Sequence, residues 1–203
     1  MEKVIITIAR QYGSGGKTIG ETLARDLGIN CYDRELMRLA SDESGIAEGL
    51  FGKADEKLKN SPLIRITKNV YKGQLIPPES DEFTSNDNLF NYQAKVIRQL
   101  AEAESCVIIG RCSDVIVEDA FRIFICSSFK KRVERIQGLE KEPEDLKKLE
   151  SRIRAVDAKR RDYYQYYSGN EWGKPKNYDL CLNSGTLGIE RCVEIIANSV
   201  TLG

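Results

Sequence analysis

Five short apolar runs, separated by longer stretches with helical spacing, dominate the distribution of hydrophobic and polar residues along the chain. The first run, residues 4–9, is apolar and rich in β-branched residues, as in a strand that is buried on both faces. Buried strands that alternate with helices form a parallel sheet covered by helices on each side. The pattern therefore predicts an α/β fold with strands at about 4–9, 29–32, 106–109, 121–126 and 178–183.

Between these runs, apolar residues recur every three or four positions, which is the spacing of amphipathic helices. Gly28 suits the end of the first helix, and Asp33 is a plausible N-cap for the second, which contains residues 36–40. The other expected helices cover residues 16–27, 85–104, 129–136, 142–167 and 187–199.

A chain of 203 residues fits a single domain, which we divide into a sheet-forming core and two excursions. Most of residues 41–104 is polar and dotted with glycine and proline, so we predict an insertion that forms an arm. Residues 139–177 contain a long charged helix with a narrow apolar stripe, and we predict a helical lid. The core is expected to comprise about residues 1–40, 105–138 and 178–203.

A glycine-rich segment follows the first strand and opens the first helix, which is the context of a phosphate-binding loop. Its glycines can turn several amides towards one phosphate at the positive end of the helix. Lys17 would neutralise phosphate charge, and the Thr18 hydroxyl would reach Mg²⁺. Gln11 stands where the usual pattern has its first glycine. The candidate ATP-binding residues are Gly13, Ser14, Gly15, Gly16, Lys17 and Thr18.

Polar residues also follow three other predicted strands, and ligands of such sheets bind beyond the carboxyl ends of the strands. Arg111 comes one residue after a buried strand and could clamp an acceptor phosphate, or it could cap the strand end or pair with Asp114. Asp33 could bind a ligand or simply cap a helix. Residues 183–185 complete the set.

The long charged helix carries several arginines. Arg154, Asp157 and Arg161 are spaced by three and four residues and so share a face. We predict that Arg161, rather than Arg160, closes over the phosphates, although a solvated charged face is the alternative.

Two neighbouring features of this part of the chain have simpler expectations. The aromatic segment 163–167 could stack a base or pack back on the domain. Arg132 and Arg135 are expected to be surface charges.

Composition narrows the classes of function. Lys plus Arg and Asp plus Glu each number 31, so no basic field suggests nucleic acid. No apolar run approaches membrane-spanning length, and the N-terminus leads straight into a strand, so we expect a cytoplasmic protein. The absence of histidine excludes Ser-His and Cys-His nucleophile pairs. Because the six cysteines also lack the spacing of zinc ligands, we expect no zinc site. Phosphoryl transfer depends on positioning and charge and remains open.

Four segments resemble the bacterial cytidylate kinase-like family. They are Ile-Ile-Thr-Ile-Ala-Arg-Gln-Tyr-Gly-Ser-Gly-Gly at 5–16, Tyr-Asp-Arg-Glu-Leu at 32–36, Val-Ile-Ile-Gly-Arg-Cys-Ser-Asp at 107–114 and Leu-Asn-Ser-Gly-Thr-Leu at 182–187. The resemblance implies a P-loop NTPase fold, a three-layer αβα sandwich around a five-stranded parallel sheet, with an acceptor-binding arm and a lid. It also implies an ATP- and Mg²⁺-dependent nucleoside monophosphate kinase.

By position, the resemblance implies that the loop binds ATP and that Asp33, Arg111 and Asp114 face the acceptor. Arg161 and Arg154 would belong to the lid. True cytidylate kinases usually have Gly-Arg-Asp where this chain has Cys112 after the arginine, so the base is the open point. We expect transfer to CMP or dCMP; another small-molecule acceptor, or a nucleotide-binding module with little turnover, are the alternatives.

Overall fold

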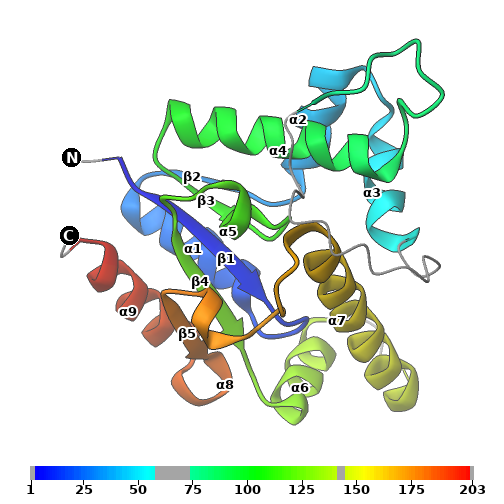
Figure 1. Ribbon diagram of the computed structural model, residues 1–203. Coiled ribbons are helices and arrows are strands. Elements are labelled where there is room, and N and C mark those ends of the chain that lie inside the picture. Colours follow the sequence, from blue (N-terminus) through cyan, green and yellow to red (C-terminus); the bar gives the residue numbers. More distant parts are fainter. Residues whose placement is uncertain (1–2, 58–73, 141–144, 202–203) are drawn as a thin grey trace.

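The computed structural model describes residues 3–57, 74–140 and 145–201 (Figure 1). Residues 58–73 of the predicted arm and 141–144 of the predicted lid lie outside the described residues. Across the described ranges, strands and helices alternate along most of the chain, as the apolar pattern predicted.

The centre of the molecule is a five-stranded sheet in which every neighbouring pair is parallel. The strand order is β2-β3-β1-β4-β5, so the central strand is the first in the chain. The predicted five-stranded parallel sheet is confirmed, with strand ends shifted by up to two residues. The strands are β1 (Ile5–Arg10), β2 (Asn30–Tyr32), β3 (Cys106–Ile109), β4 (Phe121–Cys126) and β5 (Leu180–Asn183).

Helices cover both faces of this sheet. The longer helices are α1 (Gly16–Leu27), α2 (Glu35–Ser44), α3 (Glu48–Lys57), α4 (Asn86–Ala103), α6 (Phe129–Leu139), α7 (Leu146–Ser168) and α9 (Ile189–Thr201). Short helices that the sequence pattern did not predict are α5 (Ser113–Ile116), η2 (Pro175–Asn177) and α8 (Ser184–Leu187).

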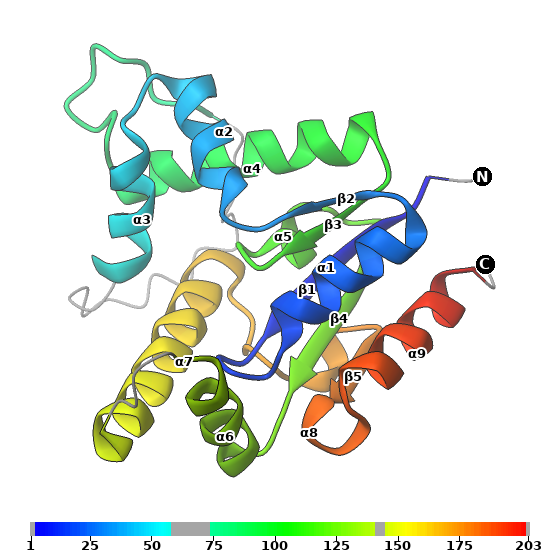
Figure 2. The ribbon, with the colours of Figure 1, turned by 180° about the vertical axis from the view of Figure 1, so that it is seen from behind.

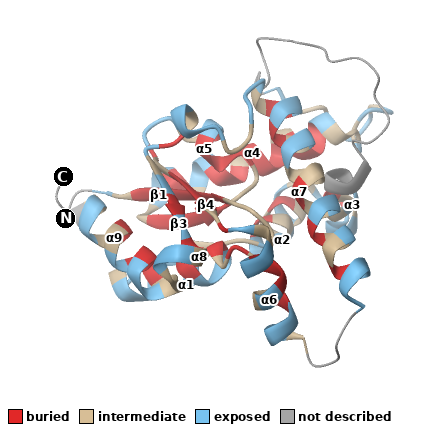
Figure 3. Cartoon of the chain, turned by 90° about the horizontal axis from the view of Figure 1, so that it is seen from below, coloured by how far each residue is buried: buried red, intermediate tan, exposed pale blue. Residues whose placement is uncertain are grey.

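The two faces of the sheet form separate cores because side chains alternate along each strand. Ile6 and Ile8 of β1 pack with α1 and α9, which lie side by side on one face (Figure 2). Ile5 of β1 and Ile108 of β3 belong to the cluster on the opposite face, with α4 and α5. Figure 3 shows the buried positions gathered in the sheet and on the inward sides of the helices.

The helices α2, α3 and α4 pack together beside the second core. Leu36 of α2, Phe51 of α3 and Leu89 of α4 are buried in the same cluster as the sheet residue Ile108. Ser85 is the N-cap of α4, and its hydroxyl accepts a hydrogen bond from the Asn88 amide at 3.3 Å. The helix predicted at 85–104 is therefore present as α4. The division of the chain into core, arm and lid stays a prediction.

The helices α6 and α7 stand at the end of the sheet towards which the strands point (Figure 1). They are joined by a small cluster of Val133, Ile136, Leu149 and Ile153. The far end of α7 contributes Tyr164 and Tyr167 to the core around α4. This packing sets the first half of α7 beside the loop that follows β1.

Candidate active site

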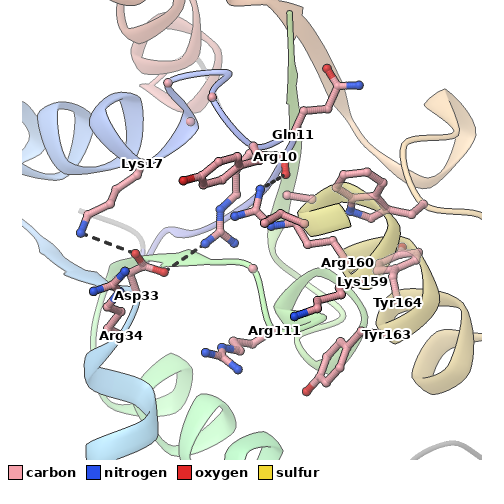
Figure 4. A pocket seen from close by; sticks show the side chains of 18 of the residues that line it. Arg10, Gln11, Lys17, Asp33, Arg34, Arg111, Lys159, Arg160, Tyr163 and Tyr164 are labelled. Atoms are coloured by element: carbon pink, nitrogen blue, oxygen red, sulfur yellow. Dashed lines mark hydrogen bonds and ion pairs between the residues drawn. The ribbon is translucent and has the colours of Figure 1, made fainter. Parts of the chain in front are cut away.

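The carboxyl ends of β1, β2 and β3 border a cavity of about 810 Å³, whose opposite wall comes from α7 (Figure 4). Of the residues predicted to bind ligands, it is lined by Gly13, Gly15, Gly16, Lys17, Thr18, Asp33, Arg111 and Asp114. Ser14, which belongs to the same loop, is buried and does not line the cavity. Residues 183–185 do not line the cavity because β5 is the sheet edge farthest from β2.

The glycine-rich loop is shaped to receive an anion. Gly13 and Gly15 both have φ near +78°, a conformation that residues with a side chain rarely adopt. Gly15 is the N-cap of α1, and no side chain caps this end of the helix. The first turn of α1 also contains no acidic residue. The positive end of the helix dipole is therefore directed at the cavity without an acidic side chain in its own first turn, which suits phosphate.

Gln11 fits the place of the usual first glycine for a structural reason. Its φ is not positive, since Arg111 and Cys112 are the two non-glycine residues with positive φ in the described ranges. Its amide donates to the Ile125 carbonyl at 3.0 Å, and its side-chain Oε1 accepts from the Ser127 amide at 3.0 Å. The glutamine thus ties the start of the loop to the end of β4.

The loop is also held by two arginines that we expected on the surface, and this expectation was wrong. Arg132 is buried and pairs with Asp157 of α7 at 2.5 Å. The same pair binds the Tyr12 backbone: Asp157 accepts from its amide at 2.7 Å, and Arg132 donates to its carbonyl at 3.1 Å. Arg135 donates to the Gly13 carbonyl at 2.8 Å. Arg132, Arg135 and Asp157 therefore fix the backbone of the loop at residues 12–13.

Ser184 of α8 gives further support, because its hydroxyl lies within hydrogen-bonding distance of the Ser14 carbonyl. The polar residues after β5 therefore act on the outer side of the loop rather than in the cavity.

Asp33 lies between two cations at the end of β2. Its Oδ1 is 3.1 Å from Arg10 Nη2, and its Oδ2 is 3.7 Å from Lys17 Nζ (Figure 4). The suggestion that Asp33 caps α2 is wrong, since Arg34 occupies the N-cap position and no side chain caps the helix. The carboxylate instead faces the loop and the cavity.

Arg111 sits in an unusual backbone turn after β3. Gly110, Arg111 and Cys112 have φ values of 76°, 60° and 54°, all in the left-handed region. The Ser113 amide closes the turn by donating to the Gly110 carbonyl at 3.1 Å. Left-handed backbone at a residue with a side chain costs roughly 1 kcal/mol or more and occurs mainly at functional sites. The turn presents Arg111 to the cavity, and Cys112 also lines the cavity although it is buried in the neighbouring core.

Asp114 forms the floor of the cavity below this turn. Asp114 is buried, with 6% of the residue exposed, and its carboxylate accepts a hydrogen bond from the Tyr164 hydroxyl at 2.8 Å. Burial raises the pKa of the Asp114 carboxyl to about 6, although the bond from Tyr164 acts in the opposite direction. The predicted acceptor-facing carboxylate is thus already engaged by a tyrosine of α7.

The arginine of α7 that reaches the cavity is Arg160, not Arg161. Ile153, Asp157, Arg160 and Tyr164 follow one another at spacings of four, three and four, and this side of the helix faces inward. Arg161 is one step further around the helix and is exposed. Arg160 donates to the Arg10 carbonyl at 2.9 Å, and burial lowers its pKa.

Arg154 lies on the same outward side as Arg161. Its guanidinium is 4.1 Å from the centre of the Phe129 ring and does not line the cavity. The sequence grouped 154, 157 and 161 on one face, but Asp157 lies at the edge of the buried face and the two arginines lie outside it.

The aromatic segment mostly packs back on the domain. Tyr164 and Tyr167 are buried, and Tyr167 stacks on Phe90 with ring centres 3.9 Å apart. Tyr163 lines the cavity near Lys159 (Figure 4).

Thr18 lines the cavity at the start of α1, and its hydroxyl suits Mg²⁺ that takes its other ligands from phosphate and water. Residues 3–57, 74–140 and 145–201 contain no group of three or more acidic, cysteine or histidine residues arranged to hold a metal. None of the helices described in these ranges is long and apolar enough to cross a membrane.

The cavity is strongly cationic although the whole chain has a formal net charge of zero. Its seven basic side chains are Arg10, Lys17, Arg34, Arg111, Arg135, Lys159 and Arg160, and its three acidic ones are Asp33, Asp114 and Glu140. This excess of positive charge favours a polyanionic ligand. Sequence reasoning missed Arg10, although Arg10 stands directly before the glycine-rich loop. It considered the basic run 159–161 as part of a lid but chose Arg161 from it rather than Lys159.

Known proteins resemble this chain over nearly its whole length. The model of the cytidylate kinase-like family matches residues 5–186. A crystal structure of an uncharacterized protein from Eubacterium ventriosum is 25% identical, with all of both chains covered and a TM-score of 0.72. A shikimate kinase from Bacteroides thetaiotaomicron, 14% identical over 98% of each chain with a TM-score of 0.55, shares the P-loop NTPase fold. None of the curated proteins matches.

Proposed function

Because this chain belongs to the cytidylate kinase-like family, we propose that it transfers the γ-phosphoryl group of ATP to a nucleoside monophosphate, with CMP or dCMP as the first candidates. Family and fold make the chain a P-loop kinase. The identity of the acceptor is the part that we propose.

One observation supports this proposal most directly. The anion-binding loop after β1 and Arg111 after β3 lie on neighbouring strands and line the same cavity. A kinase for phosphorylated acceptors needs two anion sites within reach of each other, one for each substrate. The excess of basic side chains in the cavity fits two such anions.

In the proposed reaction, the loop amides and Lys17 hold the β- and γ-phosphates, and Arg111 holds the acceptor phosphate in line. Arg160 supplies the cation from α7 that the sequence assigned to Arg161. Asp33 and Asp114 lie on the acceptor side of the cavity, and Arg154 has no part. Mg²⁺, held by Thr18 and the nucleotide, would neutralise phosphate charge when bound.

The test is a screen for ADP release from ATP with CMP, dCMP, UMP and AMP, followed by phosphorylated and hydroxylated metabolites. We expect turnover with a pyrimidine monophosphate. ADP release that is the same with and without each nucleotide acceptor would contradict the proposal.

Lys17→Ala is the matched control for this screen. We expect its turnover to fall by about 10³-fold or more, as for loss of a cation from a phosphoryl-transfer site. Its fold should survive, because Lys17 is half-exposed and its pairs with Asp33 and Glu21 contribute little to stability. Near-normal turnover in this variant would place the reaction elsewhere.

A second candidate acceptor class follows from Cys112 and Asp114. Cys112 is buried and carries a thiol in place of a carboxylate, and the Asp114 carboxylate already accepts a hydrogen bond from Tyr164. Neither residue therefore offers a carboxylate without a hydrogen-bond partner to a cytosine base. This favours a different small-molecule acceptor, which the metabolite half of the screen would identify. ATP binding without ADP release for any acceptor would favour a nucleotide-binding module.

A further inference from the structure

Arg10, the last residue of the central strand β1, lines the cavity between the glycine-rich loop and the turn that follows β3. Figure 4 shows its guanidinium extending from β1 towards Asp33, with Lys17 on one side and Arg111 on the other. Nothing in the sequence motifs singled this residue out. Its neighbours come from the glycine-rich loop, from the end of β2 and from the end of β3.

The space for this side chain is provided by two glycines. A Cβ at Gly16 would lie 2.6 Å from the Arg10 Cβ, and a Cβ at Gly110 would overlap the Arg10 Nη1. Real Cβ atoms essentially never make such contacts. The start of α1 therefore packs closely against the stem of Arg10, and the β3 turn, in which Gly110 has a positive φ, leaves room for its guanidinium.

Arg10 is also fixed at its backbone and its tip. Its carbonyl accepts from Arg160 of α7 at 2.9 Å, and its guanidinium lies 3.1 Å from Asp33. Its side chain is only 18% exposed. Because the contacts described above restrict this largely buried arginine, it loses little conformational entropy when a ligand binds. Such a charge is preorganised for the ligand.

We propose that Arg10 contacts the phosphoryl group during transfer, between Lys17 on the donor side and Arg111 on the acceptor side. The inference rests on the proposed kinase function. In the step, the bond from the γ-phosphorus to the β–γ bridging oxygen breaks, and a bond to an acceptor phosphate oxygen forms. ADP leaves with the bridging oxygen, and the dianionic acceptor oxygen carries no proton to remove. A planar guanidinium can donate hydrogen bonds to two equatorial oxygens of the phosphoryl group during its transfer.

The first test compares wild type, Arg10→Gln and Arg10→Lys with the best acceptor from the screen. We expect Arg10→Gln to lower kcat by about 10²–10³-fold while the affinity for a fluorescent ATP analogue changes by less than about fivefold. Arg10→Lys keeps the charge but not the two parallel N–H donors of the guanidinium, so its kcat should lie between those of wild type and Arg10→Gln. Arg25→Gln, a change to an exposed arginine of α1 outside the cavity, should leave kcat unchanged. A kcat for Arg10→Gln within about threefold of wild type would overturn the proposal.

A double-mutant cycle with Asp33→Asn separates contact from indirect action. If Arg10 only positions Asp33, Arg10→Gln should have no further effect in the Asp33→Asn background. We expect the loss of kcat to be of similar size in both backgrounds, because Arg10 acts on the phosphoryl group itself. Disappearance of the effect would overturn the proposal.

A third measurement does not need an acceptor. ADP with aluminium fluoride imitates a transferring phosphoryl group, and its binding can be followed by thermal shift. We expect aluminium fluoride to increase stabilisation by ADP in wild type and in Arg25→Gln but not in Arg10→Gln, with ADP alone acting equally on all three. Equal responses of wild type and Arg10→Gln to aluminium fluoride would overturn the proposal. If no acceptor is phosphorylated, the proposed function fails, and this measurement still decides the role of Arg10.

Discussion

The two halves of the cavity differ in how their residues contribute to stability. On the donor side, which comprises loop residues 11–18 and their supports, charged and polar groups are mostly paired with backbone. On the acceptor side, which comprises Asp33, the turn at 110–112 and Asp114, two residues adopt left-handed backbone and a carboxyl is buried.

This difference between the two sides indicates which of them contains features that lower the stability of the fold. Hydrogen bonds and ion pairs around the loop hold it in one shape, whatever ligand is present. A buried carboxyl with a raised pKa and two strained residues are unfavourable for folding, and such features usually persist at functional sites. The acceptor side is therefore the half whose geometry follows from function rather than from stability.

The largest expected effect comes from breaking the donor side. Asp157→Ala leaves Arg132 buried without its ion-pair partner and removes the acceptor of the Tyr12 amide. Loss of one partner of a buried pair typically destabilises by about 3–5 kcal/mol, and we expect a loss of this size in urea unfolding. Because the loop loses support, the KM for ATP should also rise.

Arg154→Ala is the control on the same helix, since this arginine is exposed, with its guanidinium over the Phe129 ring and 3.9 Å from the Glu150 carboxylate. Its effect should be within about 0.5 kcal/mol. If Asp157→Ala and Arg154→Ala were equally stable, the donor side would not be held as described.

A change on the acceptor side, Asp114→Asn, is expected to raise the stability of the protein, by less than Asp157→Ala lowers it. The pKa of Asp114 is about 6 in the folded protein and near 4 when unfolded, so the folded state binds the proton more tightly. Wild-type stability should therefore fall as pH rises from about 4 to 6 through this group, by roughly 3 kcal/mol at most. Asp114→Asn keeps an oxygen for Tyr164 and has no charge to bury, so it should be more stable than wild type at pH 7.5 and not at pH 4.

Tyr164→Phe sharpens this prediction. The bond from Tyr164 lowers the pKa of Asp114, so its removal should move the fall in stability to higher pH. Thermal unfolding of the three proteins across pH 4 to 8 measures both effects. An Asp114→Asn variant with the same pH dependence as wild type would show that the buried carboxyl imposes no penalty.

The sequence predicted the glycine-rich loop itself better than the supports of that loop or the assembly of the acceptor side, and the reason is locality. Strand, glycine-rich loop and helix are contiguous in the chain, so residues 4–27 define them alone. The strands were correct to within two residues because each is a short, mainly apolar run bounded by turn or helix patterns. The acceptor side is assembled from the ends of β2 and β3 and from α7, whose mutual positions depend on the whole fold.

Residues were misjudged where the sequence alone does not fix the phase of a helix or the partner of a charge. Arg161 and Arg160 differ by one residue, which is about 100° around the helix, and only the packing of Ile153 and Tyr164 decides between them. Arg132 was expected on the surface because its partner Asp157 lies 25 residues away. Arg10 was overlooked because a charged residue at a strand end has no distinctive pattern.

The smallest predicted effect tests the strain at Arg111. Arg111→Ala and Arg111→Gly both remove the guanidinium, so both should lose acceptor binding. They differ in backbone preference, because glycine adopts φ near +60° without strain and alanine does not. We expect the glycine variant to be more stable than the alanine variant by about 1 kcal/mol in urea unfolding. The same pair at Arg25, inside α1, should give the reverse order by about 1 kcal/mol, since glycine disfavours a helix. If alanine were the more stable residue at both positions, the turn after β3 would not be strained, and the acceptor side would lose its main difference from the donor side.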